Sequence, residues 1–394
     1  MSILSVNAGS SSLKFALYPV VNQTMGEAEV TGNIEGLEPA GQPRMSFCAA
    51  GSSKESQSIA VDPGQDVFEA ALSALKEVLH SRFSHIPLQA VAHRVVHGGQ
   101  QFTQTVRVTP HVLAELSKLN QLAPLHQPHN LAGIEAFAKS FTQLPQFACF
   151  DTAFHRSLSA LETTFAIDQQ LTAQGVRRYG FHGLSYQYVS QVLQRQTPRA
   201  QGRVVMAHLG NGASLCAMTA LESRATTMGF SALDGLMMGS RSGALDPGVV
   251  LYLLEQGWQH DAIQNLLYKK SGLLGVSGIS ADMRTLRASS QASARFAIDL
   301  FTHRIIREIG ALSAVVGGLE VLAFTGGIGE HDAVLRREVT QALSYLGIEI
   351  DDAINQVACA DQIKAIHTAS SKVQVWVIPT DEGRVAAQEA LSLL

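Results

Sequence analysis

The sequence carries little charge and no run of basic residues. Only 16% of its 394 residues are charged, and 29 Lys and Arg against 33 Asp and Glu give a formal net charge of −4. Because nucleic acids and anionic membranes are bound through a concentrated positive field, we expect neither as a partner. Hydrophobic residues make up 46% of the chain, which is enough for sizeable cores and excludes a disordered protein.

Cysteine is scarce, and no hydrophobic run is long. The four cysteines lie far apart and form no C-x-x-C pair, which predicts free thiols in a reducing compartment. The apolar run over residues 309–319 is too short to cross a bilayer, and the first residues lack the basic segment of a secretory signal. We therefore expect a cytoplasmic protein.

Several familiar enzyme motifs are missing. Without a Gly-Lys dipeptide there is no Walker A loop, and without Asp-Phe-Gly or His-Arg-Asp there is no protein-kinase signature. G-x-S-x-G and H-E-x-x-H are also absent, which argues against hydrolases and zinc proteases of those types. The glycines at 326–329 do not form G-x-G-x-x-G, so a Rossmann dinucleotide site is disfavoured.

Strand and helix patterns alternate along the chain, which predicts α/β architecture. The length favours two domains over one. We expect strands at 3–7, 12–18, 147–150, 321–324 and 373–378, and a second hairpin beginning at Val204. Helices are expected at 67–79, after Thr109-Pro110, after a cap at Asn130, from about Asp332, and at 384–394.

Two glycine- and serine-rich turns, about 200 residues apart, resemble each other. One is Asn7-Ala8-Gly9-Ser10-Ser11-Ser12-Leu13, and the other is Gly210-Asn211-Gly212-Ala213-Ser214-Leu215. Corresponding hairpins indicate either a duplicated fold with a cleft between its halves or two ordinary turns. With a third glycine turn at 326–329, they offer backbone N–H groups that can surround a phosphate. We interpret the set as a nucleotide site that uses both domains, against the alternative that each is only a turn.

Two arginines lie among small residues instead of in charged stretches. Arg94 is in His93-Arg94-Val95-Val96-His97-Gly98-Gly99, and Arg241 is in Gly239-Ser240-Arg241-Ser242-Gly243. A planar guanidinium suits the oxygens of a phosphoryl or carboxylate group. The alternative is that each arginine bonds loop carbonyls.

Histidines and acids complete the candidates. His93 and His97 would lie about 13 Å apart on a strand, too far for one metal ion. The segment 124–129 is interpreted as a rigid loop with one functional histidine, His126, and His182 lies in a similar setting. The alternative for each of these two histidines is a purely structural role. Asp151 and Glu382 each follow an apolar strand, a common position for binding a metal–phosphate complex. Helix capping is the alternative, and it suits Asp381 better than Glu382.

Taken together, these segments resemble the acetate kinase family, acyl-phosphate kinases of the sugar kinase and actin superfamily. The resemblance runs through the chain in order. It is carried by residues 7–15 (Asn-Ala-Gly-Ser-Ser-Ser-Leu-Lys-Phe), 93–99, 150–155 (Phe-Asp-Thr-Ala-Phe-His), 178–183 (Arg-Tyr-Gly-Phe-His-Gly), 208–213, 228–230, 235–243 and 324–330.

The resemblance implies two duplicated ribonuclease H-like, actin-like ATPase domains with an interdomain cleft. They would cover residues 1–150, with helix 385–394 packing on that domain, and residues 151–384. It implies reversible phosphoryl transfer between ATP and acetate to give acetyl phosphate and ADP, a role in acetyl-CoA synthesis, and a homodimer. The cofactor would be Mg²⁺, for which Mn²⁺ can substitute.

Site roles also follow from the resemblance, residue by residue. Catalytic positions are Asp151, Arg94, Arg241, His182 and His126, and metal positions are Asn7 and Glu382. Acyl-pocket positions are Arg94, Val96, Leu125, Phe181 and Ala232. Nucleotide positions are Lys14, His208, Leu209, Gly210, Asn211, Gly212, Asp282, Met283, Arg284, Gly326, Gly327, Ile328, Gly329 and Glu330.

The sequence departs from the family pattern in two places. Leu184-Ser185-Tyr186 replaces the common Thr-Ser-His, and Ser231-Ala232-Leu233-Asp234 replaces Thr-Pro-Leu-Glu. The second change includes the acyl-pocket position Ala232, so propionate remains the alternative substrate. Two other classes of protein fit the sequence less well. A chaperone-like ATPase would need a partner-binding domain for which the chain has no room, and a metal-dependent hydrolase would need a ligand set that the histidine spacings do not supply.

Overall fold

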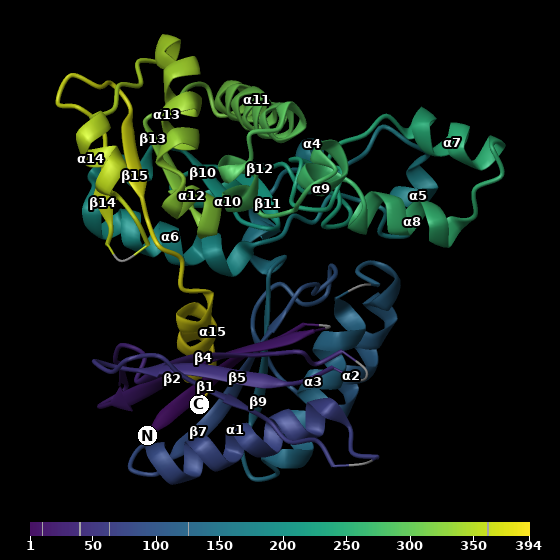
Figure 1. The fold of residues 1–394 in the computed structure, drawn as a ribbon, viewed down its shortest axis with the longest axis vertical. Helices are drawn as coiled ribbons and strands as arrows, with labels where there is room; N and C mark the ends of the chain where they lie inside the picture. The colour runs from purple at the N-terminus through teal and green to yellow at the C-terminus, as the bar shows by residue number, and fades with distance from the viewer. Residues whose placement is uncertain (10, 39–40, 63, 125, 361) are drawn as a thin grey trace. The chain divides into compact units, whose positions relative to one another are not determined.

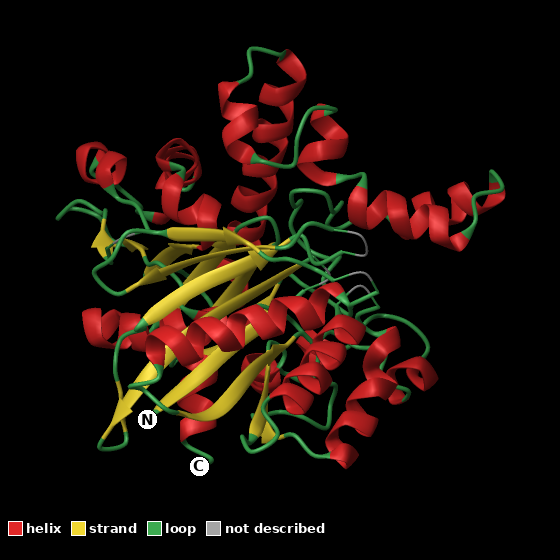
Figure 2. Cartoon of the chain, turned by 60° about the horizontal axis from the view of Figure 1, so that its bottom comes forward, coloured by secondary structure: helices red, strands yellow, loops and turns green. Residues whose placement is uncertain are grey.

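The computed structural model describes residues 1–9, 11–38, 41–62, 64–124, 126–360 and 362–394. The chain divides into two compact units. The first comprises Met1–Ala153 together with Asp381–Leu394, and the second comprises Phe154–Thr380. Each unit is built on its own sheet, with helices packed against the strands (Figures 1 and 2). Among the described helices, none combines the length and the hydropathy needed to cross a membrane.

The sheet of the first unit has the strand order β6-β5-β4-β2-β1-β7-β9-β8, with β3 paired to β2. Its strands are β1 (Ser2–Ala8), β2 (Ser12–Val21), β3 (Thr24–Met25), β4 (Val30–Glu35), β5 (Arg44–Ala49), β6 (Glu55–Ser58), β7 (Leu88–Val95), β8 (Val106–Arg107) and β9 (Gln146–Phe150). Its helices are α1 (Val67–Phe83), α2 (Pro110–Ser117), α3 (Gln127–Ser140) and α15 (Glu382–Leu391), and a 3-10 turn spans Lys118–Gln121.

Successive side chains of β1 point to opposite faces of the sheet of the first unit, and each face is covered by different helices. Leu4, Val6 and Ala8 join a buried cluster with the apolar face of α1 and with Phe137 of α3. Residues next to them along a strand point to the opposite face, against which α15 packs: Ser5 Oγ lies close to Gly383, and Cys149 Sγ contacts the carbonyl of Ala386. Residues of β1 and β7 that share this second face are therefore held near the start of α15.

The sheet of the second unit has the order β12-β11-β10-β13-β15-β14. The strands are β10 (Arg203–Leu209), β11 (Ala213–Thr219), β12 (Glu222–Thr226), β13 (Val321–Thr325), β14 (Lys364–Ala365) and β15 (Gln374–Val377). The helices are α4 (Ala160–Thr163), α5 (Gln169–Ala173), α6 (Gly183–Gln196), α7 (Pro247–Glu255), α8 (His260–Lys269), α9 (Gly272–Ser277), α10 (Met283–Ala288), α11 (Ala292–Val315), α12 (Gly326–His331), α13 (Ala333–Ala342) and α14 (Asp352–Val357), with 3-10 turns at Ala153–Ser157, Pro198–Gln201 and Ser344–Leu346.

The two sheets repeat one topology. In the first, β1 pairs antiparallel with β2 and parallel with β7, which pairs parallel with β9. In the second, β10 pairs antiparallel with β11 and parallel with β13, which pairs parallel with β15. The corresponding hairpins carry the two glycine- and serine-rich turns. The α/β prediction and the duplicated fold are therefore confirmed.

Local predictions were mostly confirmed. Both hairpins form, Thr109 caps α2 with Pro110 in its first turn, Asp381 caps α15, and none of the four cysteines, which all lie among the described residues, forms a disulfide. Asn130 was predicted as a helix cap, and this is wrong: α3 already begins at Gln127, with Pro128 in its first turn.

Two further boundaries differ from prediction. Because α3 starts at Gln127, the expected loop over 124–129 is helical in its second half. The helix expected from about Asp332 is preceded by a further helix, α12. Its glycine-rich sequence was predicted to form a turn. Asp332 instead caps α13 by accepting from the Leu335 N–H.

Candidate active site

Three side chains meet where neighbouring parallel strands of the first unit end. Asn7 is near the end of β1, Arg94 is near the end of β7, and Asp151 directly follows β9. Arg94 donates to both carboxylate oxygens of Asp151, from Nε at 3.1 Å and from Nη2 at 2.5 Å. Its Nη1 donates to Asn7 Oδ1 at 3.2 Å. The carboxyl ends of parallel strands are the usual location of a ligand site in α/β proteins.

Glu382 joins this cluster from α15. Its Oε2 lies 3.6 Å from Arg94 Nε. Asp381 fixes the start of α15, because its Oδ1 accepts hydrogen bonds from the Arg384 N–H at 2.9 Å and from the Tyr18 hydroxyl at 2.6 Å. A chain segment far from β7 in sequence is thereby anchored beside it.

The cluster combines strong burial with opposite charges. The Asp151 side chain is 1% exposed and that of Arg94 is 19% exposed. Burial by itself lowers the pKa of Arg94, but the carboxylates of Asp151 and Glu382 outweigh it and raise that pKa above its usual value. The guanidinium is therefore permanently charged.

Two amide side chains of α3 fix the segment that follows β7. Asn130 accepts from the Val96 N–H at 3.0 Å and donates to the Ala8 carbonyl at 2.6 Å. Gln127 accepts from the His97 N–H and donates to the His97 carbonyl. The interior Asn130 is thus a brace between β1 and β7. Sequence reasoning missed this role because a capping residue and a bracing residue look alike in sequence.

Other predicted residues of the first unit lie around these elements. Val96 is 3% exposed and directly follows β7, and His126 is the residue before α3. Lys14 is exposed on β2, opposite Asn7 in register. Leu125 lies outside the described residues. His93 is structural: its Nε2 pairs with Gln146 Oε1 at 2.6 Å, and burial lowers its pKa to about 4.

The second unit brings His182 and His208 together. Their rings stack with centroids 4.2 Å apart. His182 has a left-handed backbone, with φ of 59°, just before α6. His182 Nδ1 pairs with Ser214 Oγ, and His208 Nδ1 pairs with Ser185 Oγ, each at 2.8 Å. A Cβ added to Gly212 would lie 3.3 Å from His182 Nε2, so this ring faces the β10–β11 turn.

The loop that carries Arg241 also reaches that turn. Arg241 Nη1 donates to the Ala232 carbonyl at 3.0 Å, and a Cβ added to Gly212 would lie 3.9 Å from the same nitrogen. Phe181 is buried, and its carbonyl pairs with His155 Nε2 at 2.9 Å. The second unit therefore gathers Arg241, His182 and His208 beside one glycine turn.

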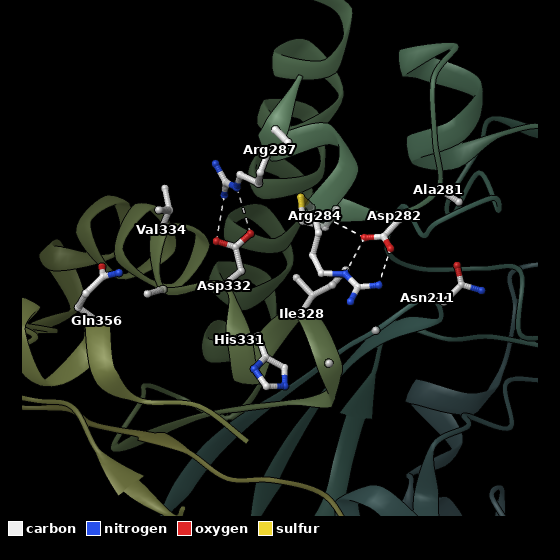
Figure 3. A pocket seen from close by; sticks show the side chains of 15 residues that line it. Asn211, Ala281, Asp282, Arg284, Arg287, Ile328, His331, Asp332, Val334 and Gln356 are labelled. Carbon is white, nitrogen blue, oxygen red and sulfur yellow. Dashed lines mark hydrogen bonds and ion pairs between the residues drawn. The ribbon is translucent and has the colours of Figure 1, made fainter. Parts of the chain in front are cut away.

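A pocket of about 1050 Å³ lies in the same unit (Figure 3). Of the predicted nucleotide residues, those that line it are Gly210, Asn211, Asp282, Met283, Arg284, Gly327 and Ile328. Among the lining residues Arg284 pairs with Asp282, with its Nη2 2.6 Å from Oδ2. Its size and its mixture of apolar and charged groups suit a nucleotide-sized ligand.

The remaining nucleotide candidates of the second unit support this pocket without lining it. Glu330 Oε1 accepts from the Gly326 N–H at 2.7 Å and from the Thr380 N–H at 3.1 Å. Burial raises the pKa of Glu330. Gly326 has φ of 76°, and a Cβ there would lie 2.8 Å from the Leu209 carbonyl oxygen. These contacts join the end of β10 to the start of α12.

Comparison with known proteins identifies the family. The model of the Acetokinase family matches residues 2–388. The chain belongs to the acetate kinase family. An acetate kinase from Rhodopseudomonas palustris is 50% identical over 99% of this chain and 98% of its own length. One from Nitrobacter hamburgensis is 43% identical over 100% of this chain and 96% of its own.

Solved structures of acetate kinase family members have the same fold. A propionate kinase from Francisella tularensis has a TM-score of 0.89 at 35% identity, covering 98% of both chains. An acetate kinase from Porphyromonas gingivalis has a TM-score of 0.87 at 34% identity, covering 100% of this chain and 99% of its own. The resemblance read from the motifs is therefore correct, and the protein is a kinase of this family.

Sequence reasoning missed part of the pocket of this acetate kinase family member. The additional lining residues are Ala281, Arg287, Ala288, His331, Asp332, Ala333, Val334 and Gln356. Arg287 forms an ion pair with Asp332, with its Nε 3.1 Å from Oδ2. Ala281 and Arg287 lie close to the matched segment 282–284, and His331 and Asp332 directly follow the matched segment 324–330; position in the sequence was the signal for these four. Gln356 reaches the pocket from α14, which no motif connects to it.

Proposed function

We propose that this member of the acetate kinase family transfers the γ-phosphoryl group of ATP to acetate, reversibly, giving acetyl phosphate and ADP. The observation that carries the proposal is the buried Arg94–Asp151 pair, with Asn7 and Glu382 beside it, at the carboxyl ends of parallel strands. The nucleotide-sized pocket of the second unit supports ATP as the donor.

The proposed chemistry needs positioning and charge neutralisation more than proton transfer. Acetate is already ionised at neutral pH, so the acceptor requires no general base. The transferring phosphoryl group carries its charge on equatorial oxygens, which cationic and N–H donors stabilise. In this proposal Arg94 and Arg241 bind those oxygens and His182 and His126 donate further hydrogen bonds. Asp151 orients the Arg94 guanidinium, as the two hydrogen bonds between them support.

The residues fit a divalent cation. Mg²⁺ prefers oxygen ligands and retains several waters. Glu382 offers an anionic oxygen whose side chain is 23% exposed, and Asn7 offers an amide oxygen in the same cluster. No group of three or more His, Cys, Asp or Glu side chains is arranged to hold a metal among the described residues. On the two oxygens and the resemblance to the family, we assign Mg²⁺, with Mn²⁺ as a substitute, to Asn7 and Glu382, where it would neutralise charge on the ATP phosphates.

Acetate is proposed over propionate because of Val96. This branched, buried side chain follows Arg94 by two positions, and it would narrow the space beside the guanidinium. The resemblance to the family also assigns Phe181, Ala232 and Leu125 to binding of the acyl group. Ala232 replaces a proline common in the family and is the feature that favours some tolerance of propionate. The similarity to a propionate kinase keeps that acid as the second candidate.

One incubation tests the activity. The purified protein is mixed with ATP, Mg²⁺ and acetate, and hydroxylamine traps any acyl phosphate as its hydroxamate. We expect hydroxamate that requires all three reagents, and a loss of roughly 10²–10³-fold in kcat for Arg241→Ala. ATP hydrolysis without hydroxamate would instead indicate an ATPase. In a parallel incubation with an ester and Mg²⁺ but no ATP, hydrolysis of the ester would indicate a metal-dependent hydrolase. If Arg241→Ala kept the wild-type kcat, Arg241 would not be a catalytic residue.

We further propose that the protein is a homodimer in the cytoplasm and that its product feeds acetyl-CoA synthesis. Helix α7 supports the dimer, because none of its residues is buried. Leu251 is 60% and Tyr252 58% exposed, and Trp258 nearby is 41% exposed. Figure 1 shows α7 and α8 lying apart from the sheet of their unit. Apolar patches of this kind mark interfaces. We expect Leu251→Asp to halve the mass measured by light scattering, and an unchanged dimer would exclude this surface.

A further inference from the structure

Two hydroxyl relays end on the stacked histidines of the second unit. The Tyr186 hydroxyl lies 2.5 Å from Ser214 Oγ, which lies 2.8 Å from His182 Nδ1. The Thr380 hydroxyl donates to Ser185 Oγ at 2.9 Å, and Ser185 Oγ lies 2.8 Å from His208 Nδ1. Tyr186, Ser214 and Ser185 are fully buried. The family pattern has histidine at the position of Tyr186, so the first relay begins at a residue that departs from that pattern.

The direction of the first relay follows from counting hydrogens. In the part of the chain that the structure describes, Ser214 is the hydrogen-bond partner of the Tyr186 hydroxyl. A buried phenol that only accepted would leave its own hydrogen without an acceptor, which is unfavourable. Tyr186 therefore donates to Ser214. Burial raises the pKa of Tyr186 well above its usual value, so the phenol keeps this hydrogen throughout the working pH range.

The same count of hydrogens also determines which ring nitrogen of His182 carries its hydrogen. Ser214 has one hydrogen and, accepting from Tyr186, donates that hydrogen to His182 Nδ1. A ring nitrogen that accepts carries no hydrogen, so the hydrogen of neutral His182 is on Nε2. The second relay gives the same result, because Ser185 accepts from Thr380 and donates to His208 Nδ1.

Both Nε2 atoms point toward the β10–β11 turn. A Cβ added to Gly212 would lie 3.3 Å from His182 Nε2, and one added to Gly210 would lie 3.9 Å from His208 Nε2. Rings with centroids only 4.2 Å apart would repel each other if both were charged. Neutral rings with Nε2–H avoid this repulsion and still offer two donors.

We propose that Tyr186–Ser214 and Thr380–Ser185 hold His182 and His208 as neutral Nε2–H tautomers, so that the stacked pair presents two N–H donors to the transferring phosphoryl group. Tyr186, Ser214, Ser185 and Thr380 are positioning residues, since they act through the imidazoles. The catalytic consequence rests on the proposed function, whereas the tautomer is a property of the protein alone.

The decisive measurement is therefore the protonation of the ring nitrogens. The full-length protein is labelled with ¹⁵N-histidine, and the ring signals of His182 are assigned by comparison with His182→Asn. We expect wild-type His182 at neutral pH to carry its hydrogen on Nε2. Tyr186→Phe frees the Ser214 hydroxyl to rotate and accept, so a measurable Nδ1–H population should appear. Ser214→Ala, which removes the donor to Nδ1, should have the same effect and replaces Tyr186→Phe if that variant does not fold.

Ser190→Ala is the matched control. Ser190 is on α6 one turn after Tyr186, and its hydroxyl donates to the Tyr186 carbonyl, so the variant removes a buried hydroxyl outside the relay. We expect Tyr186→Phe to lower kcat about tenfold, less than the roughly 10²–10³-fold that follows outright removal of a donor. The KM values for ATP and acetate should change less than twofold, and Ser190→Ala should leave the tautomer and kcat unchanged.

Two results would overturn the proposal. One is wild-type His182 with its hydrogen on Nδ1, and the other is a Tyr186→Phe spectrum with the same tautomer as Ser190→Ala. A protein that phosphorylates no short carboxylate but shows the expected ring signals would contradict the proposed function and leave the relay standing.

Discussion

Removal of Arg94 should lower both the stability and the activity of the protein, and the two effects can be separated. Its partner Asp151 is 1% exposed, and the shorter of their contacts is 2.5 Å. Arg94→Ala would leave this carboxylate buried without its main cation. Breaking a buried ion pair from one side costs about 3–5 kcal/mol. For a unit of this size that corresponds to a fall of about 10 °C in Tm, in addition to the loss of activity.

A double variant separates the two effects. Arg94→Met with Asp151→Leu removes both charges and substitutes apolar side chains of similar volume, an exchange that is often neutral for stability. We expect its unfolding free energy to return to within about 1 kcal/mol of wild type. Its kcat should stay at least roughly 10²-fold down, because the charged donor is still missing.

The assay must report on the first unit. Both tryptophans, Trp258 and Trp376, lie in the second unit, so their fluorescence would follow the wrong part of the chain. Hydrogen exchange of peptides from β1 and β9 in increasing urea gives the required free energies. Arg82→Ala is the control, because its bidentate pair with Glu55 is exposed (45% and 43%) and should contribute much less to stability than the buried pair does. Wild-type stability in Arg94→Ala, or restored activity in the double variant, would refute the reasoning.

Further predictions concern the metal, the acyl group, the nucleotide and acid stability. Glu382→Gln should raise the Mg²⁺ concentration for half-maximal rate severalfold, because the neutral amide is a weaker ligand for a hard cation; an unchanged titration would make Glu382 structural. Val96→Ala should raise the ratio of kcat/KM for propionate over acetate, by no more than the roughly 10–200-fold that one methylene is worth. An unchanged ratio, or a wild-type preference for butyrate, would contradict the assignment of Val96 to a narrow acyl pocket. Gly239→Ala would overlap the side-chain oxygen of Asn211 and should raise the KM for ATP more than that for acetate. Burial lowers the pKa of His155 from 6.5 to about 4, so the unfolded chain binds more protons between these values. The stability from this group is complete above pH 6.5 and is lost as the pH falls through 4, by at most about 3 kcal/mol; His155→Asn should flatten the slope of unfolding free energy against pH.

The strand ends were predictable from sequence because they depend on local patterns. Asn7 and Arg94 lie near the ends of apolar strands and Asp151 directly follows one, patterns that are visible in the sequence, and parallel pairing then brings these ends together. The ion pair between Arg94 and Asp151, at 57 residues apart, could not be read in the same way. It depends on which strand lies next to β7, and that is a property of the whole sheet.

The errors arose where one residue type serves two physical purposes. Asn130 has the side chain of a helix cap, but here it joins two backbones from inside α3. Glycines 326, 327 and 329 resemble a turn, yet α12 forms because the Glu330 carboxylate accepts from the Gly326 N–H and ties down its first residue. Tyr186 counted only as a departure from the family pattern. Its partner, Ser214, lies on another element, and sequence spacing does not connect them.

The position of α15 affects how the protein forms during synthesis. This helix packs on β1, β7 and β9 of the first unit, yet the ribosome makes it only after the whole second unit. The second unit is one continuous segment and can fold as it emerges, whereas the first must wait with one face of its sheet uncovered. Glu382 therefore reaches Arg94 last of all the residues around that guanidinium. A nascent chain that stops before α15 lacks both the cover for this face and the carboxylate proposed to bind the metal, so an unfinished chain remains inactive and exposes a surface that chaperones and proteases recognise.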